Sequence, residues 1–170
     1  EGVTPDLLCL AKGLTGGSMP LAVTLASEAI YDAHYSTDRT QTFYHSSSYT
    51  ANPIACAAAL ANLAIWREEP VLDRIAALAE QQQAARAMLR DTPGIINARV
   101  CGTILALDYA LGESDAGYLS ALGPRLAAFF RTRDVLVRPL GNTAYVMPPY
   151  CIAPDDLARV HDALAAAASI

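Results

Sequence analysis

Lysine is almost absent from this chain of 170 residues. Of the 12 Lys and Arg residues only Lys12 is a lysine, and it lies between an apolar run and the glycines at 13, 16 and 17. A guanidinium keeps its proton and is a poor nucleophile, whereas a lysine amine can condense with a carbonyl group. From composition alone, the single lysine could also be present by chance. The nearby glycines favour a reactive amine, because they let a ligand approach the backbone closely.

Clustered positive charge and long apolar runs are also absent. The net charge is −5 with a pI near 5.0, and no group of Lys and Arg side chains could follow a phosphate backbone, which argues against a nucleic-acid partner. The longest apolar stretch, residues 53–66, is shorter than the roughly 20 residues of a membrane span. We therefore expect no membrane segment and predict a buried helix at this stretch.

Metal and nucleotide motifs are missing as well. The four cysteines are scattered and form no C-x-x-C pair, so they indicate neither a zinc site nor a disulfide framework. We expect them to be small core residues in a reducing cytoplasm. G-x-G-x-x-G is absent, and Lys12 precedes Gly13 without a following Ser or Thr, so the Walker pattern is not met.

The first part of the chain reads as a piece of an α/β protein. It begins without methionine or a signal-like segment, which suggests part of a longer protein. Residues 7–11 and 21–26 predict two short buried strands joined by a turn, followed by a helix near 28–34 and a polar loop. Asn52 and Pro53 are typical of a helix start, and this helix should end before Pro70.

From about residue 70 the pattern changes to an α+β arrangement. Apolar residues at helical spacing, including Leu72 and Met88, predict an amphipathic helix over 71–90. Two strands around Gly102, a helix from 123 to about 130, strands at 135–139 and 144–150 joined by a turn at 141–142, and a last helix from Pro154 complete the order α, β, β, α, β, β, α. We predict two domains, residues 1–69 and 70–170.

Three segments carry a family resemblance. They are "TPDLLCLAKGLTGGSMPLAVTLAS" (residues 4–27), "HSSSYTANPIACAAALANL" (45–63) and "VLVRPLGNTAYVMPPYCI" (135–152). Together they resemble the C-terminal part of fold-type I, class III pyridoxal-phosphate aminotransferases. The resemblance implies an α/β fold: the end of a large cofactor domain, followed by a small α+β domain.

The same resemblance implies a reaction. Segments 52–59 and 138–150 are most similar to the family members of biotin synthesis, which implies amino transfer from S-adenosylmethionine to 8-amino-7-oxononanoate, giving 7,8-diaminononanoate. It also implies a cytoplasmic homodimer with active sites at the subunit interface. Two alternatives remain open: an ω-amino acid:pyruvate or ornithine-type aminotransferase, and a non-catalytic dimerisation module.

The resemblance also assigns site residues. Lys12 matches the lysine that holds pyridoxal 5'-phosphate as a Schiff base and then moves the proton. Ser46, Ser47 and Ser48 lie where relatives often have Gly-Pro-Thr, in a loop that reaches the cofactor phosphate of the neighbouring subunit. Ser48 keeps the threonine hydroxyl and is the favoured phosphate ligand. The resemblance also implies that Ser47, in place of the proline, contacts the cofactor and that Ser46, in place of the glycine, contacts the substrate and adds bulk beside it.

The third segment implies the substrate contacts. Arg138 matches the arginine that receives the substrate carboxylate, and Tyr145 lines the same pocket. Without the resemblance, Arg138 would be read as a surface residue and Tyr145 as a half-buried strand residue. No metal ligand is expected. We assign no chemistry to His45, and we expect His34 and His161 to lie in helices without partners.

Overall fold

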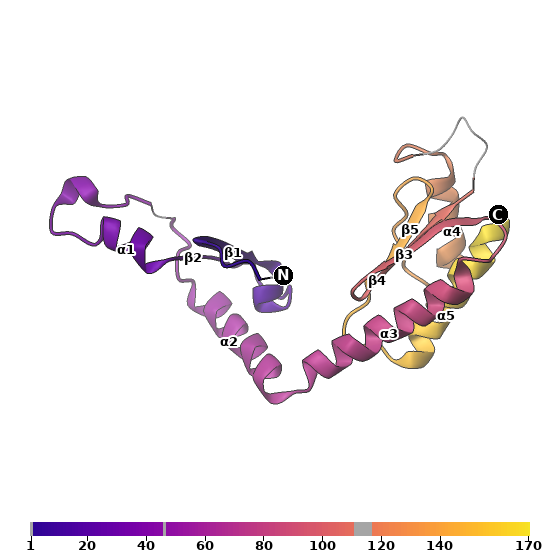
Figure 1. The fold of residues 1–170 in the computed structure, drawn as a ribbon, viewed down its shortest axis with the longest axis horizontal. Helices are drawn as coiled ribbons and strands as arrows, with labels where there is room; N and C mark the ends of the chain where they lie inside the picture. Colours follow the sequence, from indigo (N-terminus) through magenta and orange to yellow (C-terminus); the bar gives the residue numbers. More distant parts are fainter. Residues whose placement is uncertain (1, 46, 111–116) are drawn as a thin grey trace. The chain divides into compact units, whose positions relative to one another are not determined.

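The computed structural model describes residues 2–45, 47–110 and 117–170, and the chain divides into two compact units, residues 1–70 and 71–170 (Figure 1). Ser46, which the family resemblance assigned to the substrate site, lies outside the described residues. Both units mix helices and strands.

The first unit is built on an antiparallel hairpin. Strand β1 (Leu7–Ala11) pairs with β2 (Ala22–Ala26), and the 3₁₀ turn η1 (Lys12–Thr15) follows β1 directly. Helix α1 (Glu28–His34) and the short η2 (Arg39–Gln41) come next, followed by α2 (Pro53–Glu68). The predicted strands and helices of this unit are all present.

Their predicted burial is wrong. All five residues of β1 are exposed, and only Ala55 and Ala59 of α2 are buried. The physical reason is that α2 packs mainly against η1, so its large apolar side chains and those of the hairpin remain uncovered in this chain. The cysteines are not core residues either, because Cys9, Cys101 and Cys151 are exposed and Cys56 is only partly covered.

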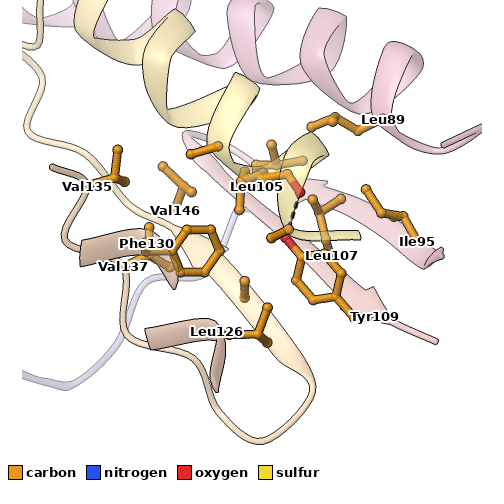
Figure 2. Packing of buried hydrophobic residues seen from close by; sticks show 14 of the residues in the cluster. Leu89, Ile95, Leu105, Leu107, Tyr109, Leu126, Phe130, Val135, Val137 and Val146 are labelled. Carbon is orange, nitrogen blue, oxygen red and sulfur yellow. Dashed lines mark hydrogen bonds between the residues drawn. The ribbon is translucent and has the colours of Figure 1, made fainter. Parts of the chain in front are cut away.

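The second unit packs three helices on one face of an antiparallel sheet. Its helices are α3 (Val71–Leu89), α4 (Leu122–Thr132) and α5 (Pro154–Ala166), which continues into η3 (Ala167–Ser169). The sheet order is β3 (Ile95–Cys101), β4 (Ile104–Tyr109) and β5 (Thr143–Val146). Alternate residues of β4 are buried, and they share one apolar cluster with Phe130 of α4 and Leu164 of α5 (Figure 2).

Polar groups inside this unit are paired. The Tyr109 hydroxyl donates to the Leu164 carbonyl at 2.9 Å, the dashed line in Figure 2, and burial raises the pKa of this phenol. Gln82 of α3 is fully buried: its amide nitrogen donates to the Thr103 carbonyl at 3.0 Å, and its oxygen lies 2.9 Å from His161 Nε2. These bonds join α3 and α5 to the β3–β4 turn.

Three helix predictions therefore need correction. His161 has Gln82 as a partner, and His34 Nδ1 lies 3.0 Å from the Gln41 carbonyl, so neither imidazole is unpartnered. On α3, Leu72 and Met88 are exposed whereas Gln82 is buried. The buried face of α3 is therefore not the face that the spacing of apolar residues predicts. The spacing did not indicate Gln82, because a polar side chain can be buried when its amide group has hydrogen-bond partners.

The predicted strand at 135–139 is also wrong. Val135 and Val137 are buried and alternate with exposed Leu136, so the segment reads as a strand. It forms no ladder, because Pro139 has no amide hydrogen, and the only pairing of this segment with β5 is the isolated bridge from Leu140 to Thr143. The predicted turn at 141–142 is confirmed, whereas β5 ends at Val146, before the two prolines at 148 and 149.

The burial of His161 predicts a pH effect on stability. Burial lowers the pKa of His161 below its usual 6.5, with Asp162 opposing the shift. The unfolded chain therefore binds more protons as the pH falls below about 6.5, so the free energy of unfolding should decrease there and be unaffected above. Urea midpoints between about pH 7.5 and 5 should fall less steeply for His161→Gln than for the unaltered protein. Equal slopes for His161→Gln and a control, His34→Gln, would contradict this reading.

Candidate active site

Lys12 lies at the point where β1 turns sharply. Its φ of 48° is in the left-handed region, which side-chain-bearing residues rarely adopt. The turn is closed by the Gly17 amide, which donates to the Lys12 carbonyl at 3.1 Å, and Gly16 and Gly17 have φ values of 62° and 80°. Only glycine adopts such angles without strain, so the glycines allow the chain to reverse directly after the lysine.

The buried Thr15 holds the other end of this turn. Its hydroxyl donates to the Met19 carbonyl at 2.6 Å, and the Ser18 hydroxyl donates to the Thr15 carbonyl at 2.8 Å. The residues between η1 and β2 are therefore fixed by side-chain hydrogen bonds. Lys12 is exposed, while the backbone that carries it is ordered by several contacts.

Lys12 lines an open hollow of about 1110 Å³ in the first unit. One wall comes from residues 11–24, including Thr24, and the other from residues 43–51, including His45, Ser47 and Thr50. The hollow thus combines one primary amine with several hydroxyl groups. His45, for which no chemical role was predicted, stacks on Phe43 with 5.6 Å between the ring centroids.

The serine loop forms a tight turn just before α2. The Thr50 amide donates to the Ser47 carbonyl at 3.0 Å, and the Ser47 amide donates to the Thr50 hydroxyl at 3.2 Å. Ser47 and Thr50 line the hollow of Lys12, whereas Ser48 is exposed and is not among its lining residues. Thr50 is a hydroxyl that the sequence argument missed, although it lies within the same resemblance segment.

Arg138 and Tyr145 lie in the second unit, on a different open hollow of about 480 Å³. Tyr145 is a residue of β5 opposite Ala106, and Arg138 follows the buried Val137. Within the part of the chain that the structure describes, the exposed Arg138 guanidinium has no ion pair or hydrogen bond. Arg159 of α5 lines this hollow too, with Asp156 3.4 Å away.

Asn62 is a further residue that the sequence argument missed. It lies on α2, and its side-chain amide donates to the Gly13 carbonyl at 2.9 Å and to the Leu14 carbonyl at 3.2 Å. The available signal was an asparagine, a poor helix former, inside an alanine-rich helix. This contact joins α2 to the turn that carries Lys12.

Residues 2–45, 47–110 and 117–170 contain neither a cluster of metal ligands nor a membrane-spanning helix. No group of three or more His, Cys, Asp or Glu side chains there could hold a metal ion. Over the same residues, no helix is both long and apolar enough to cross a membrane.

The fold is that of transaminases. A solved adenosylmethionine-8-amino-7-oxononanoate aminotransferase from Methanocaldococcus jannaschii matches 98% of this chain with a TM-score of 0.88 at 30% identity, and 39% of that chain is covered. An (S)-enantioselective omega-transaminase from Thermomicrobium roseum matches 99% with a TM-score of 0.86 at 31% identity, over 38% of its own chain.

The sequence comparisons define the family. The model of class III aminotransferases matches residues 1–168, and the chain belongs to this family. Adenosylmethionine-8-amino-7-oxononanoate aminotransferases from Synechococcus elongatus and Nitratidesulfovibrio vulgaris are 41% and 40% identical over 96% and 92% of this chain. The chain spans 38% and 30% of the length of these two relatives.

The N-terminal cap of α2, which directly follows the serine loop, gives a testable prediction about stability. The Asn52 side-chain oxygen accepts from the amides of Ile54 and Ala55 at 3.0 and 3.4 Å, directly after the turn at Ser47. Asn52→Ala should lower the free energy of unfolding by about 1 kcal/mol, because the cap is lost. Asn52→Asp should be nearly as stable as the unaltered protein, because its carboxylate can accept the same two hydrogen bonds. Denaturant unfolding of the three proteins measures this, and equal stability of all three would contradict the capping role.

Proposed function

We propose that this chain is the C-terminal portion of a pyridoxal-phosphate enzyme that transfers an amino group from S-adenosylmethionine to 8-amino-7-oxononanoate, giving 7,8-diaminononanoate. The observation that carries the proposal is Lys12, the single lysine, on the wall of a hollow at the end of β1. The relatives named for this reaction support the choice of substrates. Residues 1–69 would end the large domain and residues 70–170 would form the small one.

The residues around Lys12 fit pyridoxal phosphate. The cofactor offers an aldehyde, which a primary amine can bind covalently, and a phosphate, which hydroxyl groups can hydrogen-bond. The hollow supplies the Lys12 amine and, on the same wall, the hydroxyl of Thr24, while Ser47 and Thr50 on the other wall belong to the loop that would serve the cofactor of the neighbouring subunit. When bound, the cofactor supplies the electron sink for amino transfer. Lys12 Nζ would hold the cofactor and, once released, carry the proton between the two reacting carbon atoms.

Ser48 and Ser47 are the proposed phosphate contacts. The Ser47–Thr50 turn fixes the backbone there, because Ser47 and Thr50 bond to each other in both directions. We assign the loop to the cofactor of the neighbouring subunit in a cytoplasmic homodimer, with active sites at the interface. The exposure of Ser48 supports this role, since its hydroxyl is accessible to a group outside its own chain.

Arg138 is the proposed receptor for the substrate carboxylate. A planar guanidinium can donate two parallel hydrogen bonds to a carboxylate, and that of Arg138 is exposed on the 480 Å³ hollow with no ion pair among the described residues. Tyr145 lines the same hollow and would contact the apolar part of the substrate.

A second candidate is an ω-transaminase acting on another amine. The omega-transaminase from Thermomicrobium roseum, with a TM-score of 0.86, favours this alternative. Donor and acceptor assays on the intact protein separate the two reactions. Amino transfer to 8-amino-7-oxononanoate supports the first, whereas activity with β-alanine or ornithine and none with 8-amino-7-oxononanoate would overturn it.

Covalent trapping tests the role of Lys12. The intact protein that contains this chain is incubated with pyridoxal phosphate, reduced with borohydride and mapped by mass spectrometry. We expect the label on Lys12, and its loss from the peptide in Lys12→Arg, because a guanidinium does not condense with the aldehyde. Absence of a label, or a label elsewhere, would favour the non-catalytic module.

Replacement of Arg138 tests the carboxylate contact. Arg138→Lys keeps the charge but loses the paired donors, so KM for 8-amino-7-oxononanoate should rise roughly tenfold with a smaller change in kcat. Arg159→Lys, in the same hollow, is the matched control and should change KM less than twofold. Steady-state kinetics decide, and an equal effect of both variants would count against Arg138.

A further inference from the structure

We propose that Asn62 is a positioning residue for Lys12. The inference rests on the proposed function, because it concerns how Lys12 is presented to the cofactor. Asn62 does not line the hollow but bonds to the backbone of the turn whose first residue is Lys12. Its effect on the reaction would therefore pass through the geometry of this turn.

The amide of Asn62 binds two successive carbonyl groups. Its nitrogen carries two hydrogens, and the Gly13 and Leu14 oxygens lie 2.9 and 3.2 Å from it. The Asn62 oxygen faces Gly16, where a Cβ atom would come within 3.3 Å of it. Gly16 thus leaves room for the side chain as well as supplying the left-handed angle of the turn.

The backbone needs this support because Lys12 is strained. A lysine with φ of 48° occupies a conformation that costs free energy and persists only when neighbouring contacts enforce it. The Gly17 amide holds the Lys12 carbonyl at 3.1 Å, while Asn62 holds the two residues that follow Lys12. Without Asn62 the turn could relax toward ordinary angles, and the Lys12 amine would be spread over more positions.

Asn62 has no evident role in forming α2 itself. Asparagine is a poor residue inside a helix, and α2 already has Asn52 as its N-terminal cap and alanine over much of its length. The Asn62 side chain donates to carbonyl groups that lie 49 and 48 residues earlier in the sequence. Its contacts therefore benefit the lysine turn rather than the helix.

The test compares cofactor capture by variants of the intact protein. Asn62→Leu keeps the approximate shape but removes both donors, and Asn62→Gln keeps the amide. The first readout is the pyridoxal phosphate concentration that gives half-maximal borohydride labelling of Lys12. The second, taken without reduction, is the pH midpoint of the visible absorbance of the protein incubated with pyridoxal phosphate. Asn62→Leu should raise the half-maximal concentration roughly fivefold and displace the pH midpoint, and Asn62→Gln should recover part of both.

Arg67→Ala is the matched control. Arg67 is an exposed residue of the same helix, and its guanidinium lies 3.1 Å from the Glu68 carboxylate. The Arg67→Ala variant should leave both readouts unchanged. Thermal melting of the apoprotein checks that each variant is folded at the assay temperature. If the unaltered protein labels at Lys12 and folded Asn62→Leu matches it in both readouts, the positioning role is overturned while the proposed function stands. If Lys12 is never labelled, the proposed function itself fails.

Discussion

The hydrogen-bonded turn after β1 is the constraint on which the candidate site depends. It forces Lys12 into a left-handed backbone conformation and reverses the chain within a few residues, through Gly16 and Gly17. Thr15 fixes its end to Met19, and Asn62 fixes its middle to α2. A flexible side chain such as lysine is useful for covalent chemistry only when its backbone is held, because misplacement of the reacting atom is costly.

The second unit supports its own group of site residues in a different way. Buried residues of β4 share one apolar cluster with residues of three helices, and the short strand β5, paired with β4, enters the same cluster through Ala144 and Val146. Tyr145 lies between these two residues, and Arg138 follows Val137 of the same core. In this unit apolar packing, rather than a hydrogen-bond network around one turn, determines where the candidate side chains Arg138 and Tyr145 leave the core.

Local sequence signals predicted most of the fold. The caps and breakers at Asn52, Pro53 and the turn at 141–142 correctly located elements, because these residues act on their immediate backbone. Burial was predicted less well. Whether α2 is covered depends on distant partners, and a single sequence does not state which faces meet. The predicted strand at 135–139 was wrong for a related reason: its apolar residues predict an extended chain, but Pro139 has no amide hydrogen to donate, and the pairing with β5 is limited to the bridge at Leu140.

The candidate site shows the same division. Lys12 could be proposed from its amine chemistry and the neighbouring glycines, whereas Arg138 was proposed only through the family resemblance of the segment around it. Asn62 and Thr50 were missed because their roles arise from contacts that only the folded chain reveals: Asn62 meets a turn 48 residues away, and Thr50 joins Ser47 on the wall of the hollow. Side-chain amides and hydroxyls inside ordinary helices and loops carry little signal until their partners are known.

A crystal structure of the intact protein with pyridoxal phosphate is the most direct measurement of the central claim. The account predicts cofactor density continuous with the Lys12 side chain, while the Asn62 amide keeps its bonds to the Gly13 and Leu14 carbonyls. Cofactor density joined to another residue, or a cofactor site remote from the turn after β1, would contradict it.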